Sequence, residues 1–114
     1  MSAPHFHILP DVSDWLFRRL LEFDPAGRRI VGLSQYEAAQ LVARLEEDMM
    51  ALGKGAPRWH RQVVREAVIA IRARSSEAMA RKGADTDIRL SAAEAYLALQ
   101  AVMMTVTAIR MVTA

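Results

Sequence analysis

The sequence predicts an all-α fold: a compact bundle of four helices with a long, nearly all-apolar C-terminal helix. Two helix starts are strongly marked, apolar residues recur at helical spacing, and no stretch alternates polar and apolar residues as a half-buried strand does. A chain of 114 residues has room for a single hydrophobic core. We therefore expect one helical domain over residues 11–114, preceded by an extended arm over residues 1–10 that contains Pro4 and ends at Pro10.

The first helix is expected to begin at Asp11, a residue type that commonly caps helices, with Asp14 near the positive end of the helix dipole. Apolar residues then follow the spacing of a buried stripe: Val12, Trp15, Leu16, Leu20 and Phe23. Residues 24–27 carry proline and glycine at turn positions and end this helix. Residues 28–33 are expected to form a connector to the next helix, with room for a brief extended stretch.

The second and fourth helices each begin with the pattern of a capping box. In this motif the serine hydroxyl accepts a hydrogen bond from the backbone amide of the glutamate, and the glutamate carboxylate accepts one from the backbone amide of the serine. The pairs are Ser34 with Glu37, and Ser91 with Glu94. The second helix is expected to end near Leu52. Its apolar side comprises Ala38, Leu41, Val42, Leu45, Met49 and Leu52, and its solvent side Gln35, Glu37, Gln40, Arg44, Glu47 and Asp48.

Gly53 is expected to end the second helix, and Pro57 to mark the start of the third. The third helix is expected over residues 58–82 and ends at Gly83. Residues 84–90 then lead to the fourth helix, residues 91–114. That last helix carries charge only at Glu94 and Arg110.

A helix that is apolar on all sides must be covered on all sides, so we expect part of the fourth helix to meet a second copy of the chain. The residues assigned to this homodimer interface are Leu97, Leu99, Val102, Met103, Val106 and Ile109. The alternative is a central helix surrounded by the other three within one chain.

Composition narrows the class of protein. Hydrophobic residues make up 53% of the chain and the net charge is only +2, which is typical of a folded domain and does not by itself predict nucleic-acid binding. There is no cysteine, which excludes disulfides and thiolate chemistry. The N-terminus does not resemble a signal peptide, and the uncharged run 95–109 is shorter than the roughly 18 residues of a membrane span. We expect a cytoplasmic protein without a membrane span.

Four arginines of the third helix form the main candidate site. Arg58, Arg61, Arg65 and Arg72 fall within about 60° of one another around an ideal helix, and Trp59 lies beside them in sequence. Arginine and tryptophan are favoured at binding hot spots, so these five residues are predicted to bind another protein. The alternative is a solvated face that pairs with acids of the second helix.

No pattern indicates catalysis or a cofactor. The histidines His5, His7 and His60 lack a further ligand at a metal-binding spacing, and Ser75 has no histidine near it in sequence. We therefore predict no metal site, no cofactor and no enzymatic activity. Asp85 and Asp87 belong to a linker whose spacing does not match a calcium loop.

These observations favour a small helical regulatory protein that binds another protein, of the adaptor, antiactivator or inhibitor type, for example one that masks a transcription regulator. The high content of arginine and alanine in the sequence is compatible with a bacterial origin. One alternative is a nucleic-acid-binding protein that uses the arginines of the third helix. Another is a structural or assembly subunit of a larger complex.

Overall fold

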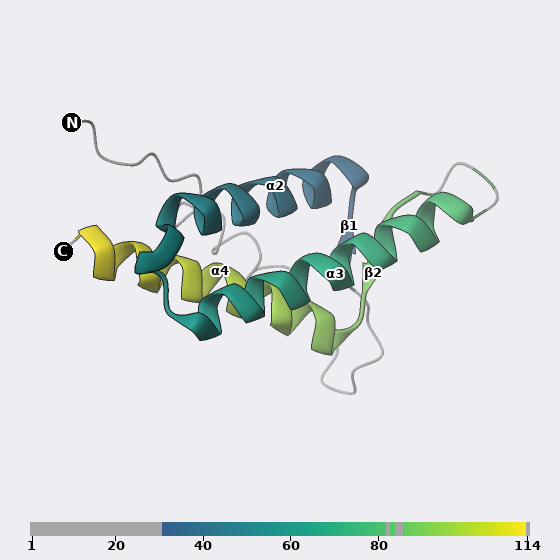
Figure 1. The fold of residues 1–114 in the computed structure, drawn as a ribbon. Coiled ribbons are helices and arrows are strands. Elements are labelled where there is room, and N and C mark those ends of the chain that lie inside the picture. The colour runs from purple at the N-terminus through teal and green to yellow at the C-terminus, as the bar shows by residue number, and fades with distance from the viewer. Residues whose placement is uncertain (1–30, 82, 84–85, 114) are drawn as a thin grey trace.

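The structure, a computed structural model, describes residues 31–81, 83 and 86–113. This part of the chain is mostly helical, as predicted, and contains three α-helices and one small β-sheet (Figure 1). The predicted N-terminal arm and the predicted first helix, residues 11–23, lie outside the described residues. The three helices correspond to the second, third and fourth helices predicted from the sequence.

The order of elements along the chain matches the predicted order of helices. It is β1 (Val31–Leu33), α2 (Gln35–Leu52), the 3₁₀ turn η1 (Gly53–Gly55), α3 (Arg58–Ala80), β2 (Ile88–Leu90) and α4 (Ala92–Thr113). The starts of α2 and α4 lie one residue after the predicted capping serines. The end of α3 lies two residues before the predicted one.

Both predicted capping boxes are present. The Glu37 N–H donates to Ser34 Oγ at 3.0 Å, and the Ser34 N–H donates to Glu37 Oε1 at 2.9 Å. In α4, the Glu94 N–H donates to Ser91 Oγ at 3.2 Å and the Ser91 N–H donates to Glu94 Oε1 at 3.0 Å. These contacts satisfy amides that have no partner inside the helix, which explains why both helices begin where they do.

A two-stranded antiparallel sheet joins the segments that lead into α2 and α4. Strand β1 pairs with β2 so that Gly32 lies opposite Arg89, and Leu33 lies opposite Ile88. Leu33, Ile88 and Leu90 are buried. Connectors were expected here, with a brief extended stretch within residues 28–33, but their pairing was not predicted, because three-residue strands are too short to show a clear alternation of polar and apolar residues.

Helix α3 runs antiparallel to both α2 and α4, and the three helices pack around one core (Figure 1). The inner side of α4 is made mostly of small residues: Ala95, Ala98, Ala101, Thr105 and Ala108 are all fully buried. Small side chains let the neighbouring helices approach closely, so α4 buries one side within a single chain.

One residue of α2 lies on the opposite side from the one predicted. Asp48 was assigned to solvent because it is charged, but it is fully buried. It follows Leu41 and Leu45 at helical spacing and so belongs to the buried stripe of α2. Here the periodicity was the better guide than the charge.

Candidate protein-binding surface

The outer face of α3 carries exposed arginines along much of its length. Arg58, Arg61, Arg65 and Arg72 are all exposed, as the sequence predicted for a surface stripe. Within the part of the chain that the structure describes, Arg58 and Arg65 form no hydrogen bond or ion pair. Their guanidinium groups therefore keep all their donors available for an anionic partner.

The other two arginines have contacts inside the chain. Arg72 Nη2 lies 2.5 Å from Glu46 Oε1 of α2, in an ion pair between partly exposed side chains. Arg61 Nη2 donates to the carbonyl oxygen of Gly53 at 3.3 Å. The alternative interpretation of the stripe, pairing with acids of the second helix, thus holds for Arg72.

Trp59 does not lie in the arginine stripe. It is half-exposed, at 44%, but around an ideal helix it lies roughly 160° from Arg61, so it borders the α4 side of α3. Its ring packs edge-on against that of His60, with the ring centroids 6.3 Å apart. Ile69, by contrast, is 67% exposed and lies within the stripe, between Arg65 and Arg72. The apolar component of this face is therefore Ile69, which the sequence analysis did not select.

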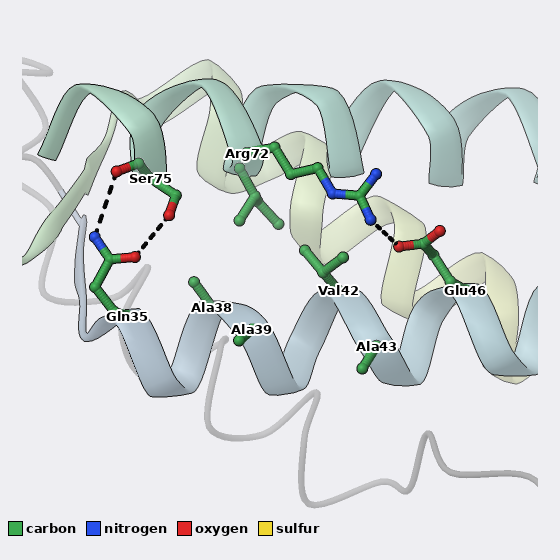
Figure 2. Close-up of a pocket in the computed structure, with 9 residues that line it drawn as sticks. Gln35, Ala38, Ala39, Val42, Ala43, Glu46, Arg72 and Ser75 are labelled. Atoms are coloured by element: carbon green, nitrogen blue, oxygen red, sulfur yellow. Dashed lines mark hydrogen bonds and ion pairs between the residues drawn. The ribbon is translucent and has the colours of Figure 1, made fainter. Parts of the chain in front are cut away.

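A groove runs between α2 and α3 beside the stripe (Figure 2). It consists of two adjoining cavities of about 360 Å³ and about 200 Å³, which share Glu46 and Arg72. The larger one is lined by Gln35, Ala38, Ala39, Val42, Ala43, Glu46, Ile71, Arg72 and Ser75, and the smaller one by Glu46, Met49, Val64, Arg65, Val68, Ile69 and Arg72. The groove thus has a largely apolar floor with charged side chains on its rim.

One end of the groove is held by a pair of side chains. Ser75 Oγ donates to Gln35 Oε1 at 2.6 Å, and the Gln35 amide donates to the Ser75 carbonyl at 3.4 Å (Figure 2). The same amide donates to the Thr86 carbonyl at 2.8 Å. Ser75 therefore fixes the relative position of α2 and α3. The groove itself was missed in the sequence analysis, because exposed alanines such as Ala39 and Ala43 carry no signal of their own.

A buried polar cluster links the three helices at the other end of the bundle. His60, Asp48 and Thr105 are fully buried and come from α3, α2 and α4, respectively. His60 Nε2 lies 2.9 Å from Thr105 Oγ1, whereas Nδ1 is buried and has no hydrogen-bond partner among the described residues. Burial, followed by the charge of Arg61, lowers the pKa of His60, and Asp48 partly opposes the shift. No group of three potential metal ligands occurs among residues 31–81, 83 and 86–113.

The residues predicted for a homodimer interface are divided between core and surface. Leu99 and Val102 belong to the core of a single chain, and Leu97 and Val106 pack partly against it. Met103 is 46% exposed and Ile109 is half-buried. The large apolar side chains that α4 leaves exposed are Tyr96, Met103, Met111 and Val112.

Helix α4 is also the one helix in the described part of the chain whose length and composition would allow it to cross a membrane, over Ala92–Val112. The core helix of a soluble protein meets the same two conditions. Ala95, Val102 and Thr105 are fully buried, so one side of α4 packs inside this fold.

No protein family, curated protein or solved structure matches this chain. The arginine stripe and the adjoining groove are therefore the features from which a function can be argued.

Proposed function

We propose that this chain is a small, non-catalytic regulatory protein of the cytoplasm that binds another protein through the outer face of α3. It would act as an adaptor, antiactivator or inhibitor by covering a surface of its partner, for example that of a transcription regulator. The observation that carries this proposal is that Arg58 and Arg65 are exposed beside exposed Ile69 on one face of α3 and pair with no other residue in the described part of the chain.

The chemistry of this face selects an acidic partner surface with an apolar patch at one end. Arginine binds carboxylates through two parallel hydrogen bonds, which adds geometric specificity to the charge attraction. Ile69 lies one turn beyond Arg65 and can bury its side chain beside the ion pair of Arg65, where water is excluded and the charged hydrogen bond is stronger. Trp59, on the other border of α3, can extend the contact towards α4.

The four-helix arrangement and the homodimer are further parts of this proposal. Residues 11–23 would supply the fourth helix of the bundle, since their apolar residues have the spacing of a buried stripe. Self-association would use the outer side of α4. Exposed Tyr96 and Met103, seven residues apart, support that choice because they lie on the same side of the helix.

The proposal can be tested by pull-down of the full tagged chain from host lysate, with and without nuclease. The parent is compared with Arg65→Glu and with a control, Arg110→Glu. The control makes the same charge change at an exposed position of α4. A stoichiometric protein that survives nuclease, is lost with Arg65→Glu and is kept with Arg110→Glu supports the proposal. Retention of that protein by both variants would place the binding surface elsewhere.

Nucleic-acid binding is the second candidate, because Arg58, Arg61 and Arg65 are exposed on successive turns of α3. Exposed Glu66 and Ile69 on the same helix count against a phosphate-binding face. In the same pull-down, nucleic acid alone on the parent sample would favour this candidate. Its affinity should then fall steeply with salt, and each lost phosphate contact should lower the slope by about one unit.

A further inference from the structure

We infer that the second copy in the proposed homodimer binds antiparallel, α4 against α4, with Met103 close to the twofold axis. The start of α4 in one copy then lies against the end of α4 in the other. This pairing rests on the homodimer of the proposed function and adds its direction and its centre. It does not involve the outer face of α3, which is assigned to a different partner.

The outer side of α4 carries a regular strip of residues that face away from the core. On an ideal helix, the residues of the strip fall within about 80° of one another. They are Ala93, Tyr96, Gln100, Met103, Thr107 and Met111, and all are exposed. They follow one another at steps of three or four residues, which is the spacing of the seam between two packed helices. The strip can therefore receive one whole helix along its length.

The strip is complementary to a reversed copy of itself. Its large apolar side chains are evenly placed, with Tyr96 seven residues before Met103 and Met111 eight residues after it. These side chains are 65%, 46% and 63% exposed, respectively. A twofold axis that crosses α4 beside Met103 places Tyr96 of each copy against Met111 of the other. A thioether beside an aromatic ring is a favourable contact, so a second copy of this chain is the occupant that the strip fits.

Charge selects the antiparallel direction. The last turn of α4 carries Arg110, which is exposed. Exposed Lys54 lies at the same end of the molecule, since a Cβ on the next residue, Gly55, would lie 3.6 Å from Val112 of α4. A parallel pair would bring these two basic ends together. An antiparallel pair instead holds the two Arg110 side chains about 20 Å apart. This is more than twice the ~8 Å screening length at physiological ionic strength, so their repulsion is largely removed.

The chain has no cysteine, so single cysteines on α4 can report the direction in the full-length protein. Tyr96→Cys and Met111→Cys replace exposed side chains and should leave the core intact. After subunit exchange, a short bis-maleimide should join a mixture of the two variants several-fold faster than either variant alone. The reason is that like positions lie about 22 Å apart in the antiparallel pair. Met103→Cys should cross-link to itself, because it lies near the axis.

The matched control is Tyr96→Cys mixed with Met79→Cys, whose methionine is 66% exposed and belongs to α3. This mixture should cross-link no faster than Tyr96→Cys alone. If Tyr96→Cys and Met111→Cys each cross-link faster alone than when mixed, the pair is parallel and the inference is overturned, while the homodimer stands. A parent that is dimeric in sedimentation equilibrium but gives no cross-link from α4 would overturn it as well. A monomeric parent would remove the homodimer itself.

A second measurement uses charges instead of cysteines. Tyr96→Glu and Met111→Lys each place a charge against an apolar side chain of the other copy and should weaken dimerisation. When both changes are made in one chain, an antiparallel pair sets the new acidic and basic side chains against each other. Dimerisation should then recover several-fold relative to either single variant in sedimentation equilibrium. A parallel pair would set like charges together, so a double variant that dimerises no better than the single variants would contradict the antiparallel direction.

Discussion

The imidazole of His60 in α3 is hydrogen-bonded to the hydroxyl of Thr105 in α4, with Nε2 and Oγ1 2.9 Å apart. The Thr105 hydroxyl donates its single hydrogen to the Ala101 carbonyl at 2.7 Å, so His60 Nε2 must be the donor in the bond to Thr105. This geometry therefore assigns a proton to Nε2 of His60. Its other nitrogen, Nδ1, is buried and forms no hydrogen bond with any residue that the structure describes.

The first prediction concerns the pH dependence of stability. Burial is the main cause that lowers the pKa of folded His60 below 6.5, with Arg61 adding to the shift and Asp48 of α2 opposing it. Below pH 6.5 the unfolded chain binds the proton more readily than the folded one. The free energy of unfolding should thus be highest above pH 6.5 and fall as the pH drops towards the pKa of the folded state. Urea unfolding measured between pH 8 and pH 5 tests this expectation.

The control for this experiment is His60→Gln, which keeps a polar side chain but removes the titrating group. Its free energy of unfolding should be lower at pH 8, and the loss between pH 8 and pH 5 should be smaller than in the parent. An identical pH dependence in the two proteins would assign the effect to other groups.

The second prediction separates a buried hydroxyl from an exposed one on the same helix. Thr105→Val keeps the shape of the side chain but leaves the His60 Nε2–H without an acceptor, which should cost about 1–3 kcal/mol. Thr107→Val also removes a hydroxyl that donates to a carbonyl, that of Met103 at 3.0 Å, but its side chain is exposed. It should change the stability by less than about 0.5 kcal/mol. Equal effects in urea unfolding at pH 8 would contradict this account of Thr105.

The third prediction compares two glycines of η1. Gly53 ends α2 with φ 53° and ψ −132°, a conformation that side-chain-bearing residues rarely adopt. Gly53→Ala should therefore destabilise the protein by about 1–3 kcal/mol. At Gly55, φ is ordinary and a Cβ would lie 3.6 Å from Val112 Cγ2, a normal packing distance. Gly55→Ala should be neutral or stabilise by up to about 1 kcal/mol, because it restricts the unfolded chain. Thermal unfolding should show a lower melting temperature for Gly53→Ala and an unchanged or higher one for Gly55→Ala.

Local sequence signals predicted the helices well. The capping boxes at Ser34 and Ser91 and the stop at Gly53 are short-range chemistry, so the sequence around them is sufficient to place the helix ends. The β1–β2 pairing was not predicted. It joins Gly32 to Arg89, 57 positions apart, and depends on the packing of the helices that follow each strand.

The candidate site was predicted only in part for a similar reason. Helical spacing correctly placed Arg58 and Arg65 on the surface, but it cannot show which cation has an internal partner. Arg72 pairs with Glu46, 26 positions away. Asp48 illustrates the opposite error, because its charge suggested solvent although its spacing from Leu41 matches the buried stripe. The groove depends on two helices together, which no single segment can reveal.

The fourth prediction concerns the outer side of α4. Val102 is fully buried within one chain, whereas the next residue, Met103, is 46% exposed, so Met103 can meet a second copy without disturbing the core. If α4 forms the proposed homodimer, Met103→Lys places a charge in an apolar contact and should weaken dimerisation while leaving the free energy of unfolding of the monomer nearly unchanged. Sedimentation equilibrium over a range of protein concentrations measures the dissociation constant of the dimer directly.

The matched control is Met79→Lys, which makes the same change at a methionine that is 66% exposed and belongs to α3, not to the helix of the proposed contact. It should leave the dissociation constant of the dimer unchanged, since Met79 lies near the C-terminal end of α3 whereas Met103 lies in the second half of α4. A parent that is monomeric at all concentrations would remove the homodimer from the proposal. A dimer that is insensitive to Met103→Lys but sensitive to Met79→Lys would move the interface from α4 to the end of α3. In either case the proposed partner-binding role of Arg65 would stand, because it depends on a different face of the molecule.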